Sequence, residues 1–443
     1  MKRLYLFTLA FLGGCEAASA DPRLNIADRL VWSEPPTVIA TGLEPNSDFT
    51  LVTERRSLWG TATERSELKF RSSSDGEFDT SVTPASGRDV ADPYEPIRSM
   101  SYLQGEELAD LDKHFIRFRV LDAAGTKVTE QIVGIGPDRE ALVEMSLGSD
   151  FPGAYIMRPE ELDEPRPAII LLGGSEGGDS GSRSLAPLYA AEGYVVLGLP
   201  YYSPAWGGQA QFPDLPSAFA DIRVDYLEEA VVEIRKRDDV EADKVLLVGV
   251  SKGAEFVLLA GALIPDESAG GGFCGIVADV PSDVVWEGWG AGTEAGQVSS
   301  FSWRGESLPF IPYQDIGRAL DSSDSYTMTD AHVNGRLSNP DRVEDALIPV
   351  ERIDETVLLI GGMQDQVWNS GEMARSIVKT RNAAGLETEA YIYNEGGHGV
   401  GGSPLVRTSR ANLSARLENF PATIEFLKRQ AQRDDCRGQT TTD

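Results

Sequence analysis

A serine between two glycines is the first feature of the sequence that suggests chemistry. It is Ser251, in the stretch Gly249-Val250-Ser251-Lys252-Gly253, which has the spacing G-x-S-x-G. The apolar run VLLVGV precedes it and KGAEFVLLAGAL follows it, so we expect a strand, a sharp turn and a helix. Glycines two positions on either side avoid crowding between that strand and that helix. The pattern predicts a nucleophile on a strained turn, and an ordinary glycine-rich turn is the competing interpretation.

A serine hydroxyl needs a base that is itself held by a carboxylate, and the sequence offers few choices. It contains three histidines. His114 lies in a strand-like segment, and His332 lies in a polar loop, where we interpret it as structural or substrate-side. His398 follows the strand-like EAYIYN within a glycine-rich loop, and Asp365 follows TVLLIGG. Because α/β-hydrolases order these groups as serine, acid and histidine, we predict Asp365 as the acid and His398 as the base.

Attack by such a serine also requires hydrogen-bond donors for a developing oxyanion. We expect the backbone N–H of Lys252, directly after the serine, and a second from Gly174 or Ser175 in LLGGSEGGDSG. That loop lacks G-K-[ST] and does not fit G-x-G-x-x-G, so it does not predict phosphate or dinucleotide binding. This chemistry requires no metal or organic cofactor, and the sequence has no C-x-x-C or Cys/His cluster for structural zinc.

Two segments with different hydrophobic periodicity must position these residues. Residues 24–157 carry short runs of period two broken by turn residues, which predicts an all-β sandwich of Ig-like size. In residues 160–432, continuous apolar strands alternate with amphipathic helices, as in a parallel sheet covered on both faces. We therefore predict an α/β-hydrolase domain with a doubly wound, mostly parallel sheet, ending in a helix at FPATIEFLKRQAQ. Residues 433–443 are predicted to form a solvated tail.

The first 20 residues have the composition of an export signal. Lys2 and Arg3 precede an apolar run that is too short to cross a bilayer, and small residues follow. Two processing sites are open: Leu12-Gly13-Gly14-Cys15 resembles the lipobox of bacterial lipoproteins, whereas Ala18-Ser19-Ala20 is a plain A-x-A site. We favour lipidation at Cys15. The protein is expected to be exported, either periplasmic or lipid-anchored to a bacterial membrane, with no other membrane contact.

The composition is strongly acidic, with 70 acidic and 40 basic residues and a formal net charge of −30. Such a surface repels nucleic acids and anionic membranes, and it disfavours a polyanionic substrate unless a local basic pocket compensates. Once Cys15 is set aside, Cys274 and Cys436 are compatible with a disulfide or with two free thiols. Trp286 and Trp289 are expected in a loop over the site, where they either line an acyl pocket or simply pack.

Six segments of the chain have counterparts in a known family. They are PIRSMSY, GLPYYS, GVSKGAE, SFSWRGESLPFIPY, ALIPVERIDETVLLIGGMQDQVWNS and GGH. Through them, from about residue 30 to 430, the chain resembles the acyl-CoA thioesterase and bile acid-CoA:amino acid N-acyltransferase family. That family joins an Ig-like domain to an α/β-hydrolase domain, and the resemblance implies Ser251 as nucleophile, Asp365 as acid and His398 as base. Within it, serine accompanies thioester hydrolysis and cysteine accompanies transfer to amino acids, so Ser251 implies water as the acceptor.

These observations favour a serine hydrolase of small acyl thioesters or esters that acts through an acyl-enzyme intermediate. Coenzyme A thioesters are not expected outside the cytoplasm, so an exported carboxylesterase or lactone hydrolase is the alternative. Transfer of the acyl group to an amine or hydroxyl, and a non-catalytic surface binding protein on a hydrolase fold, are two further hypotheses. No nucleic-acid partner is expected, and the sequence does not predict an oligomeric state.

Overall fold

The computed structural model describes residues 21–57, 62–103, 108–205, 208–321, 323–404, 408–433 and 436. The chain divides into two compact units: the first ends at Val133, and the second takes in Gly134 onward together with Arg29–Pro35 and the segment beginning at Ser57. The predicted export signal over residues 1–20, with Cys15, lies outside the described residues, as does most of the predicted tail.

The N-terminal strands form two sheets. Their orders are β1-β3-β6 and β2-β9-β8-β4-β5-β7. Phe70 of one sheet stacks on Phe78 of the other with ring centroids 4.7 Å apart, so the sheets pack face to face. The all-β sandwich predicted for this half of the chain is confirmed. The elements are β1 (Arg23–Asn25), β2 (Arg29–Leu30), β3 (Ile39–Thr41), β4 (Asp48–Arg56), β5 (Thr63–Arg71), β6 (Phe78–Asp79), α1 (Glu95–Arg98), β7 (Ser101–Leu103), β8 (Phe115–Leu121) and β9 (Lys127–Ile135).

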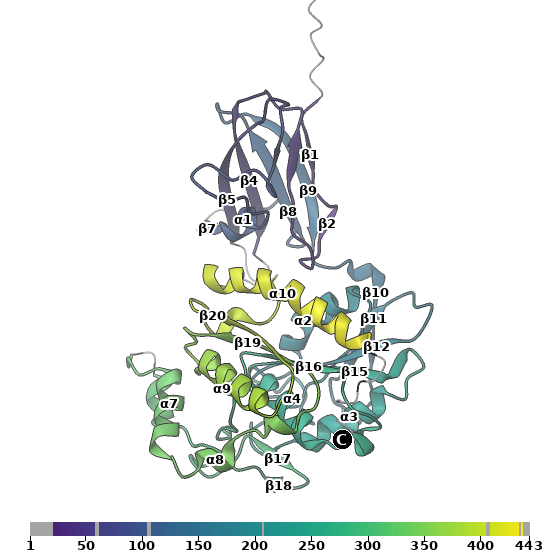
Figure 1. Ribbon diagram of the computed structural model, residues 1–443, viewed down its shortest axis with the longest axis vertical. Helices are drawn as coiled ribbons and strands as arrows, with labels where there is room; N and C mark the ends of the chain where they lie inside the picture. The colour runs from purple at the N-terminus through teal and green to yellow at the C-terminus, as the bar shows by residue number, and fades with distance from the viewer. Residues whose placement is uncertain are drawn as a thin grey trace, which may run out of the picture. The chain divides into compact units, whose positions relative to one another are not determined.

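An eight-stranded sheet organises the second unit (Figure 1). In the order β10-β11-β13-β12-β15-β16-β19-β20, β11 is antiparallel to both neighbours and the strands from β13 to β20 are parallel. Strands β13, β16 and β19 are buried along their whole length, as their continuous apolar runs predict. The strands are β10 (Leu142–Ser146), β11 (Tyr155–Pro159), β12 (Arg166–Leu172), β13 (Val195–Gly198), β15 (Val240–Val250), β16 (Gly275–Asp279), β19 (Val357–Gly362) and β20 (Thr388–Tyr393), with a small separate sheet of β14 (Ile222–Arg223), β17 (Phe301–Trp303) and β18 (Glu306–Ser307).

Helices cover both faces of this sheet. The connection from β12 to β13 steps toward one edge, whereas those from β13 to β15, β15 to β16 and β19 to β20 step toward the other. Because such crossovers are right-handed, α2 lies on one face and α3, α4 and α9 lie on the opposite face. Helix α10, at the yellow end of the chain in Figure 1, packs beside α2, with the Tyr189 and Phe420 rings 6.0 Å apart. The doubly wound architecture is confirmed. The helices are η1 (Arg139–Ala141), α2 (Ser180–Ala191), α3 (Val224–Ile234), α4 (Lys252–Leu263), α5 (Asp266–Ala269), α6 (Ile316–Ala319), α7 (Met328–Ser338), α8 (Val343–Ala346), η2 (Val350–Arg352), α9 (Ser370–Ala383), η3 (His398–Val400) and α10 (Arg410–Ala431).

Two strands within the segment predicted as the sandwich belong to the other unit. β10 and β11 pair with each other, and β11 pairs with β13 in the eight-stranded sheet. The predicted domain boundary at residue 157 is therefore wrong, because the first unit ends at Val133. The sequence misleads here because β10 is a partly exposed edge strand, and such a strand has the same period-two pattern as a strand of a sandwich.

The last helix is longer than the sequence predicts. Helix α10 begins at Arg410, where the Ser409 side chain accepts a hydrogen bond from the Asn412 N–H, rather than at Phe420. Pro421 lies inside the helix. Because proline is common in the first helical turn, the segment FPATIEFLKRQAQ places the start about ten residues late.

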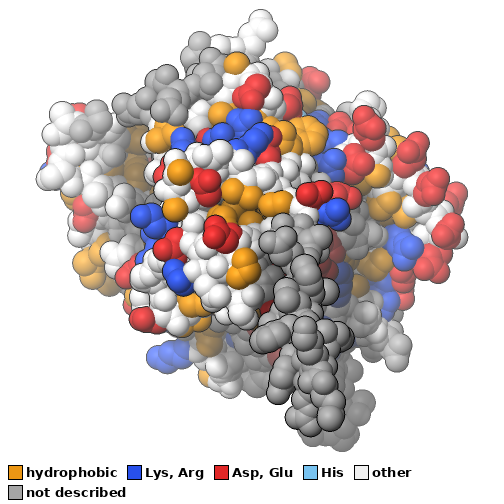
Figure 2. Space-filling model, turned by 90° about the horizontal axis from the view of Figure 1, so that it is seen from above, with side chains coloured by type: hydrophobic (Ala, Val, Ile, Leu, Met, Phe, Trp, Pro, Cys, Tyr) orange, Lys and Arg blue, Asp and Glu red, His pale blue; other side chains and the backbone are white. Residues whose placement is uncertain are grey.

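Charged side chains of both signs are scattered among apolar and uncharged groups on the face shown in Figure 2, where Asp and Glu are interspersed with Lys and Arg. Among the described residues, none of the helices combines the length and apolarity that a membrane crossing requires. The same part of the chain contains no group of three or more His, Cys, Asp or Glu side chains placed to bind a metal ion.

A disulfide joins Cys274 and Cys436, so of the two alternatives left open by the sequence the structure contains the bonded one. Cys274 lies directly before β16, and Cys436 follows α10. The bond therefore connects a central strand of the sheet to the chain beyond the last helix, and it closes a loop of 162 residues.

Reducing this disulfide is predicted to lower the free energy of unfolding by about 3–5 kcal/mol, because a loop of this length gains much chain entropy when it is opened in the unfolded state. Urea unfolding with and without a phosphine reductant measures the loss. The double variant Cys274→Ser/Cys436→Ser is the control and should be equally destabilised but insensitive to reductant. An unchanged wild-type midpoint, with both thiols shown to be free by titration, would contradict this role.

Candidate active site

Ser251 occupies a sharp turn between the end of β15 and the start of α4. Its backbone angles are φ 57° and ψ −120°, in the left-handed half of conformational space that non-glycine residues rarely adopt. The turn is held from both sides, because the Ser251 N–H donates to the carbonyl of Asp279 at 2.9 Å and the Ser251 carbonyl accepts from Ala254 and Glu255. The strained strand-turn-helix conformation predicted from G-x-S-x-G is present.

The two glycines of the motif are required by space. A Cβ atom at Gly249 would lie 2.1 Å from the carbonyl oxygen of Gly253, and one at Gly253 would lie 2.4 Å from the carbonyl oxygen of Gly173. Both obstructions are backbone atoms, so a rotamer change cannot relieve them. The motif therefore allows β15, α4 and the loop after β12 to approach one another at contact distance.

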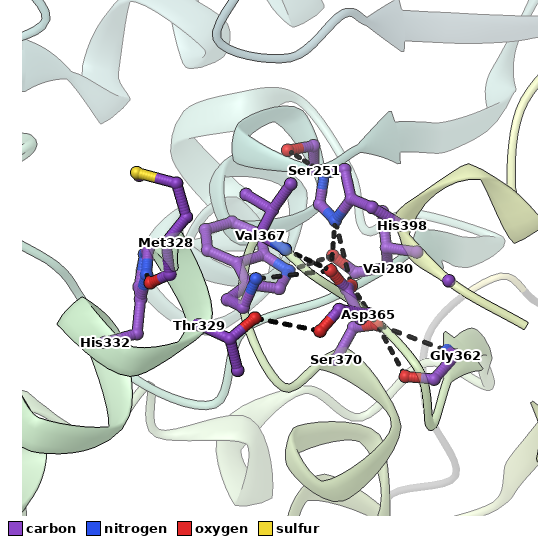
Figure 3. Close-up of polar contacts among 12 residues, drawn as sticks. Ser251, Val280, Met328, Thr329, His332, Gly362, Asp365, Val367, Ser370 and His398 are labelled. Atoms are coloured by element: carbon purple, nitrogen blue, oxygen red, sulfur yellow. Dashed lines mark hydrogen bonds and ion pairs between the residues drawn. The ribbon is translucent and has the colours of Figure 1, made fainter. Parts of the chain in front are cut away.

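His398 bridges the serine and the acid (Figure 3). Its Nε2 lies 3.0 Å from Ser251 Oγ, and its Nδ1 lies 2.9 Å from Asp365 Oδ2. A carboxylate accepts hydrogen bonds, so Nδ1 carries the hydrogen and Nε2 is left to accept the serine O–H. The structure thus brings together all three predicted residues, from the segments that follow β15, β19 and β20. Such a set is able to remove the hydroxyl proton as the oxygen attacks a carbonyl carbon.

The Asp365 carboxylate is oriented by several donors and is 5% exposed. Its Oδ1 accepts from the backbone N–H groups of Val367 and Trp368, and its Oδ2 accepts from the Ser370 hydroxyl. These contacts leave the carboxylate one arrangement in which it faces His398 (Figure 3). Sequence reasoning did not identify Ser370, although Asn369 and Ser370 at the start of a helix are a visible capping signal.

The expected oxyanion donors are only partly arranged for that task. Lys252 is the first residue of α4, and the first N–H groups of a helix have no partner within it. Gly174 lies beside the nucleophile, since a Cβ there would be 3.1 Å from Ser251 Cβ. Its N–H, however, donates to Glu176 Oε1 at 3.0 Å, so in this structure the Gly174 donor is already engaged. Ser175 lines the adjoining cavity, and its role remains a prediction.

A cavity of about 600 Å³ opens beside Ser251 and His398. That volume is in the range of pockets that hold a small organic molecule. Its walls carry two ionisable side chains besides His398, namely Glu176 and Arg416, together with the apolar side chains of Leu185 and Val250. The lining residues are Gly173, Gly174, Ser175, Glu176, Gly181, Ser184, Leu185, Val250, Ser251, His398, Gly401, Gly402, Ser403 and Arg416.

The two tryptophans considered for an acyl pocket do not line this cavity. Trp286 is 1% exposed and packs in a cluster with Ile311 and Trp368. Trp289 stacks on Phe219, with ring centroids 4.5 Å apart. Of the two interpretations left open by the sequence, both residues fit the packing one.

A buried ion pair lies directly behind the nucleophile turn, and the sequence analysis did not identify it. Lys252 Nζ contacts Glu255 Oε2 at 2.6 Å and Ser300 Oγ at 2.9 Å, and the ammonium group lies 5.1 Å from the centroids of both the Phe219 and Phe301 rings. Burial lowers the pKa of Lys252 and raises that of Glu255, because each loses hydration of its charge. The signal was present in SKGAE, where two charges three residues apart open an otherwise apolar helix.

His332 is a structural residue in this arrangement. Its ring packs edge-on against Trp286, Tyr313 and Trp368, and Nδ1 lies 2.6 Å from the carbonyl of Met328. Burial lowers its pKa to about 4, and the hydrogen bond to Met328 only partly opposes this. The remaining histidine, His114, is exposed in the first unit.

Replacing His332 with phenylalanine is predicted to reduce the acid sensitivity of the fold. Between pH 6.5 and about 4, the unfolded chain binds a proton at residue 332 that the native protein excludes, so stability falls as the pH falls through this window. From pH 7.5 to 5, the wild type should lose about 2 kcal/mol more unfolding free energy than His332→Phe. Urea titrations at the two pH values measure the difference. Equal losses would show that His332 titrates normally in the native protein.

The chain is similar to several known proteins. Residues 222–422 match the family model described as "BAAT / Acyl-CoA thioester hydrolase C terminal". Human acyl-coenzyme A thioesterase 1 is 28% identical over 405 residues, covering 88% of each chain, and mouse acyl-coenzyme A thioesterase 5 is 28% identical over 386 residues, covering 83% of each. A solved thermophilic esterase from Thermogutta terrifontis overlays 66% of this chain and 95% of its own, with a TM-score of 0.42 and 14% identity.

The family model spans both the nucleophile turn and the histidine loop, and the relatives extend the similarity over most of both chains. The resemblance seen in the sequence is thereby confirmed: the chain is a serine hydrolase related to the acyl-CoA thioesterases, and residues 222–422 match the model of the C-terminal domain of the BAAT and acyl-CoA thioester hydrolase family.

Proposed function

We propose that this protein hydrolyses acyl thioesters or esters through a covalent acyl-serine at Ser251, with His398 as general base and acid and Asp365 as its orienting carboxylate. The observation that carries the proposal is the placement of His398 Nε2 at 3.0 Å from Ser251 Oγ, with Nδ1 at 2.9 Å from Asp365. A serine hydroxyl is a weak nucleophile unless a base accepts its proton at this range.

The reaction runs in two balanced halves. Ser251 Oγ attacks the acyl carbonyl carbon while its proton passes to His398 Nε2, and the carbonyl oxygen becomes an oxyanion near the Lys252 N–H. Collapse of this intermediate breaks the bond to the leaving group, which takes the proton from Nε2. Water then repeats the sequence, giving its proton to Nε2 and releasing the carboxylic acid and the free serine. Asp365 keeps Nδ1–H directed away from the serine throughout.

The charge around the site supports a second candidate, an exported carboxylesterase. Glu176 and Arg416 are the charged side chains on the cavity wall besides His398, and Arg416 is engaged by the carbonyls of Gly399 and Ser403. The whole chain has a formal net charge of −30, so the electrostatic field around the cavity does not attract a leaving group rich in phosphate. The predicted signal over residues 1–20 favours the same candidate, since coenzyme A thioesters are not expected outside the cytoplasm. Lipidation at Cys15 is part of that proposal.

Ser251→Ala is predicted to lower kcat by at least about 10⁴-fold, because attack by Ser251 begins the reaction. A serine-directed fluorophosphonate should label the wild type at one site, which peptide mass spectrometry identifies as Ser251. Asp365→Asn should still be labelled, more slowly, which separates a loss of activation from a loss of the fold. Turnover or labelling that survives Ser251→Ala would refute the mechanism, and a folded wild type with neither would favour a binding protein.

Three substrates with the same acyl chain test which leaving group the enzyme prefers. They are the coenzyme A thioester, the uncharged N-acetylcysteamine thioester and the ethyl ester. If charge repulsion governs access, kcat/KM for the coenzyme A thioester should rise several-fold between 50 and 500 mM salt, while the uncharged pair stays constant. Stopped or continuous product assays measure both series. A preference for the coenzyme A thioester that weakens with salt would instead require a basic recognition site. Product analysis with an added amine distinguishes hydrolysis from acyl transfer.

A further inference from the structure

The segment that carries His398 has little capacity to hold its own shape. It contains Gly396, Gly397, Gly399, Gly401 and Gly402, and its one regular feature is the short 3₁₀ turn η3. Glycine loses more conformational freedom on folding than any other residue, so a glycine-rich loop must be ordered by contacts from outside. A displacement of about 1 Å in a catalytic group is enough to lower a rate by about 100-fold.

Helix α10 supplies those contacts from one face. Asn412, Arg416 and Asn419 are spaced by four and three residues, which places their side chains on one stripe of the helix. We call this set the α10 stripe. Sequence reasoning did not identify it, because all three residues lie in the part of α10 that the predicted helix omits.

Each member of the α10 stripe hydrogen-bonds to the backbone of the histidine segment. Asn412 Oδ1 accepts the Gly397 N–H at 2.7 Å, directly before His398. Arg416 donates from Nε to the Gly399 carbonyl at 2.6 Å and from Nη1 to the Ser403 carbonyl at 3.0 Å. Asn419 donates from Nδ2 to the Val400 carbonyl at 2.9 Å. The backbone on both sides of the imidazole is therefore tied to a single rigid helix.

The segment also contacts Asp279 at the end of β16. Asp279 Oδ2 accepts the Gly402 N–H at 3.1 Å, while the backbone carbonyl of Asp279 accepts the Ser251 N–H at 2.9 Å. A Cβ at Gly401 would lie 2.5 Å from Asp279 Cβ, so the two backbones are in close contact. One residue thus fixes the nucleophile turn and the histidine segment relative to each other, and Arg416 attracts its carboxylate.

We propose that Arg416 is a positioning residue for catalysis, whose guanidinium holds the His398 segment between α10 and Asp279 at hydrogen-bonding distance from Ser251. The inference rests on the proposed function. Arg416 is 9% exposed, and burying a charge is costly unless its donors are used. A guanidinium is suited to this place because it offers several N–H donors in a fixed plane, and here it spans carbonyls four residues apart.

The chain offers a matched control in Arg381. This arginine of α9 is also buried, and it donates to the backbone carbonyls of Val350, Ile353, Glu355 and Glu387, none of which belongs to the histidine segment or lines the cavity. Loss of either guanidinium removes a buried charge together with its carbonyl contacts. A difference in activity between Arg416 and Arg381 variants of equal stability therefore reports positioning rather than general destabilisation.

The first experiment compares Arg416→Met with Arg381→Met on an uncharged ester at a temperature where both are folded by circular dichroism. Arg416→Met should lower kcat about 10- to 100-fold with KM within twofold, and fluorophosphonate labelling of Ser251 should slow in parallel. Arg381→Met should keep kcat while losing stability. Methylguanidinium should restore part of kcat to Arg416→Ala and none to Arg381→Ala.

Three results would overturn the proposal: a folded Arg416→Met with wild-type kcat, a rise in KM alone, or an equal loss of kcat in both methionine variants. A rise in KM alone would make Arg416 a substrate contact. The dependence of activity on Ser251 is measured separately, so failure of the proposed mechanism appears as turnover by Ser251→Ala and is not confused with these results.

A second readout does not require turnover. The protein has three histidines, so proton NMR of imidazole N–H groups is simple to assign with His114→Gln and His332→Phe variants. The Nδ1–H of His398, shared with Asp365, should give a low-field signal in the wild type and in Arg381→Met. Loss or broadening of that signal in Arg416→Met is the expected result, and an unchanged signal would show that the segment keeps its position without the guanidinium.

Discussion

Backbone-to-backbone contact at the nucleophile turn is the constraint on which the rest of the site depends. Gly249, Gly253 and Gly173 allow β15, α4 and the loop after β12 to meet without an intervening side chain. This close approach brings the start of α4 and the loop after β12 beside Ser251. The serine in turn adopts φ 57°, a strained conformation that the surrounding structure must impose. Helix α4 is able to impose it because its residues from 252 to 260 are all buried.

The same approach explains why charged groups are found inside the domain. A helix that enters the core at its first residue carries Lys252 and Glu255 with it. The two form an ion pair, and Lys252 also donates to Ser300. Buried pairs of this kind add little net stability, since desolvation offsets their attraction. Their position beside Ser251 therefore follows from the path of the backbone and not from a gain in stability. Because α4 is buried from its first residue, the side chain of Lys252 must lie inside the domain.

The sequence predicted those parts of the site that depend on chain order and residue type. The sequence contains three histidines, and the chain order of serine, acid and histidine left few choices besides Ser251, Asp365 and His398. The structure brings these three residues together. What could not be predicted depends on side chains that meet only after folding. Glu176 accepts the Gly174 N–H within one loop. Hydrophobic periodicity predicts strands and helices but not the conformation of a loop, so this contact could not be predicted. Arg416 and Asp279 are 137 positions apart in the sequence. They come close because α10 packs along β16, with Arg416 near the end of that strand and Gln430 near its start. Strands β10 and β11 were assigned to the wrong unit because β10 is a partly exposed edge strand, and such a strand has the same period-two pattern as a strand of a sandwich.

The position of α10 in the chain has a consequence for how the protein comes into being. Ribosomes make Ser251 and Asp365 well before they make Asn412, Arg416 and Asn419, so a growing chain acquires its nucleophile and acid while the histidine segment still lacks the helix that orders it. During that interval the reactive parts exist without being assembled. The proposed catalytic geometry is therefore complete only after the last helix of the chain has been made.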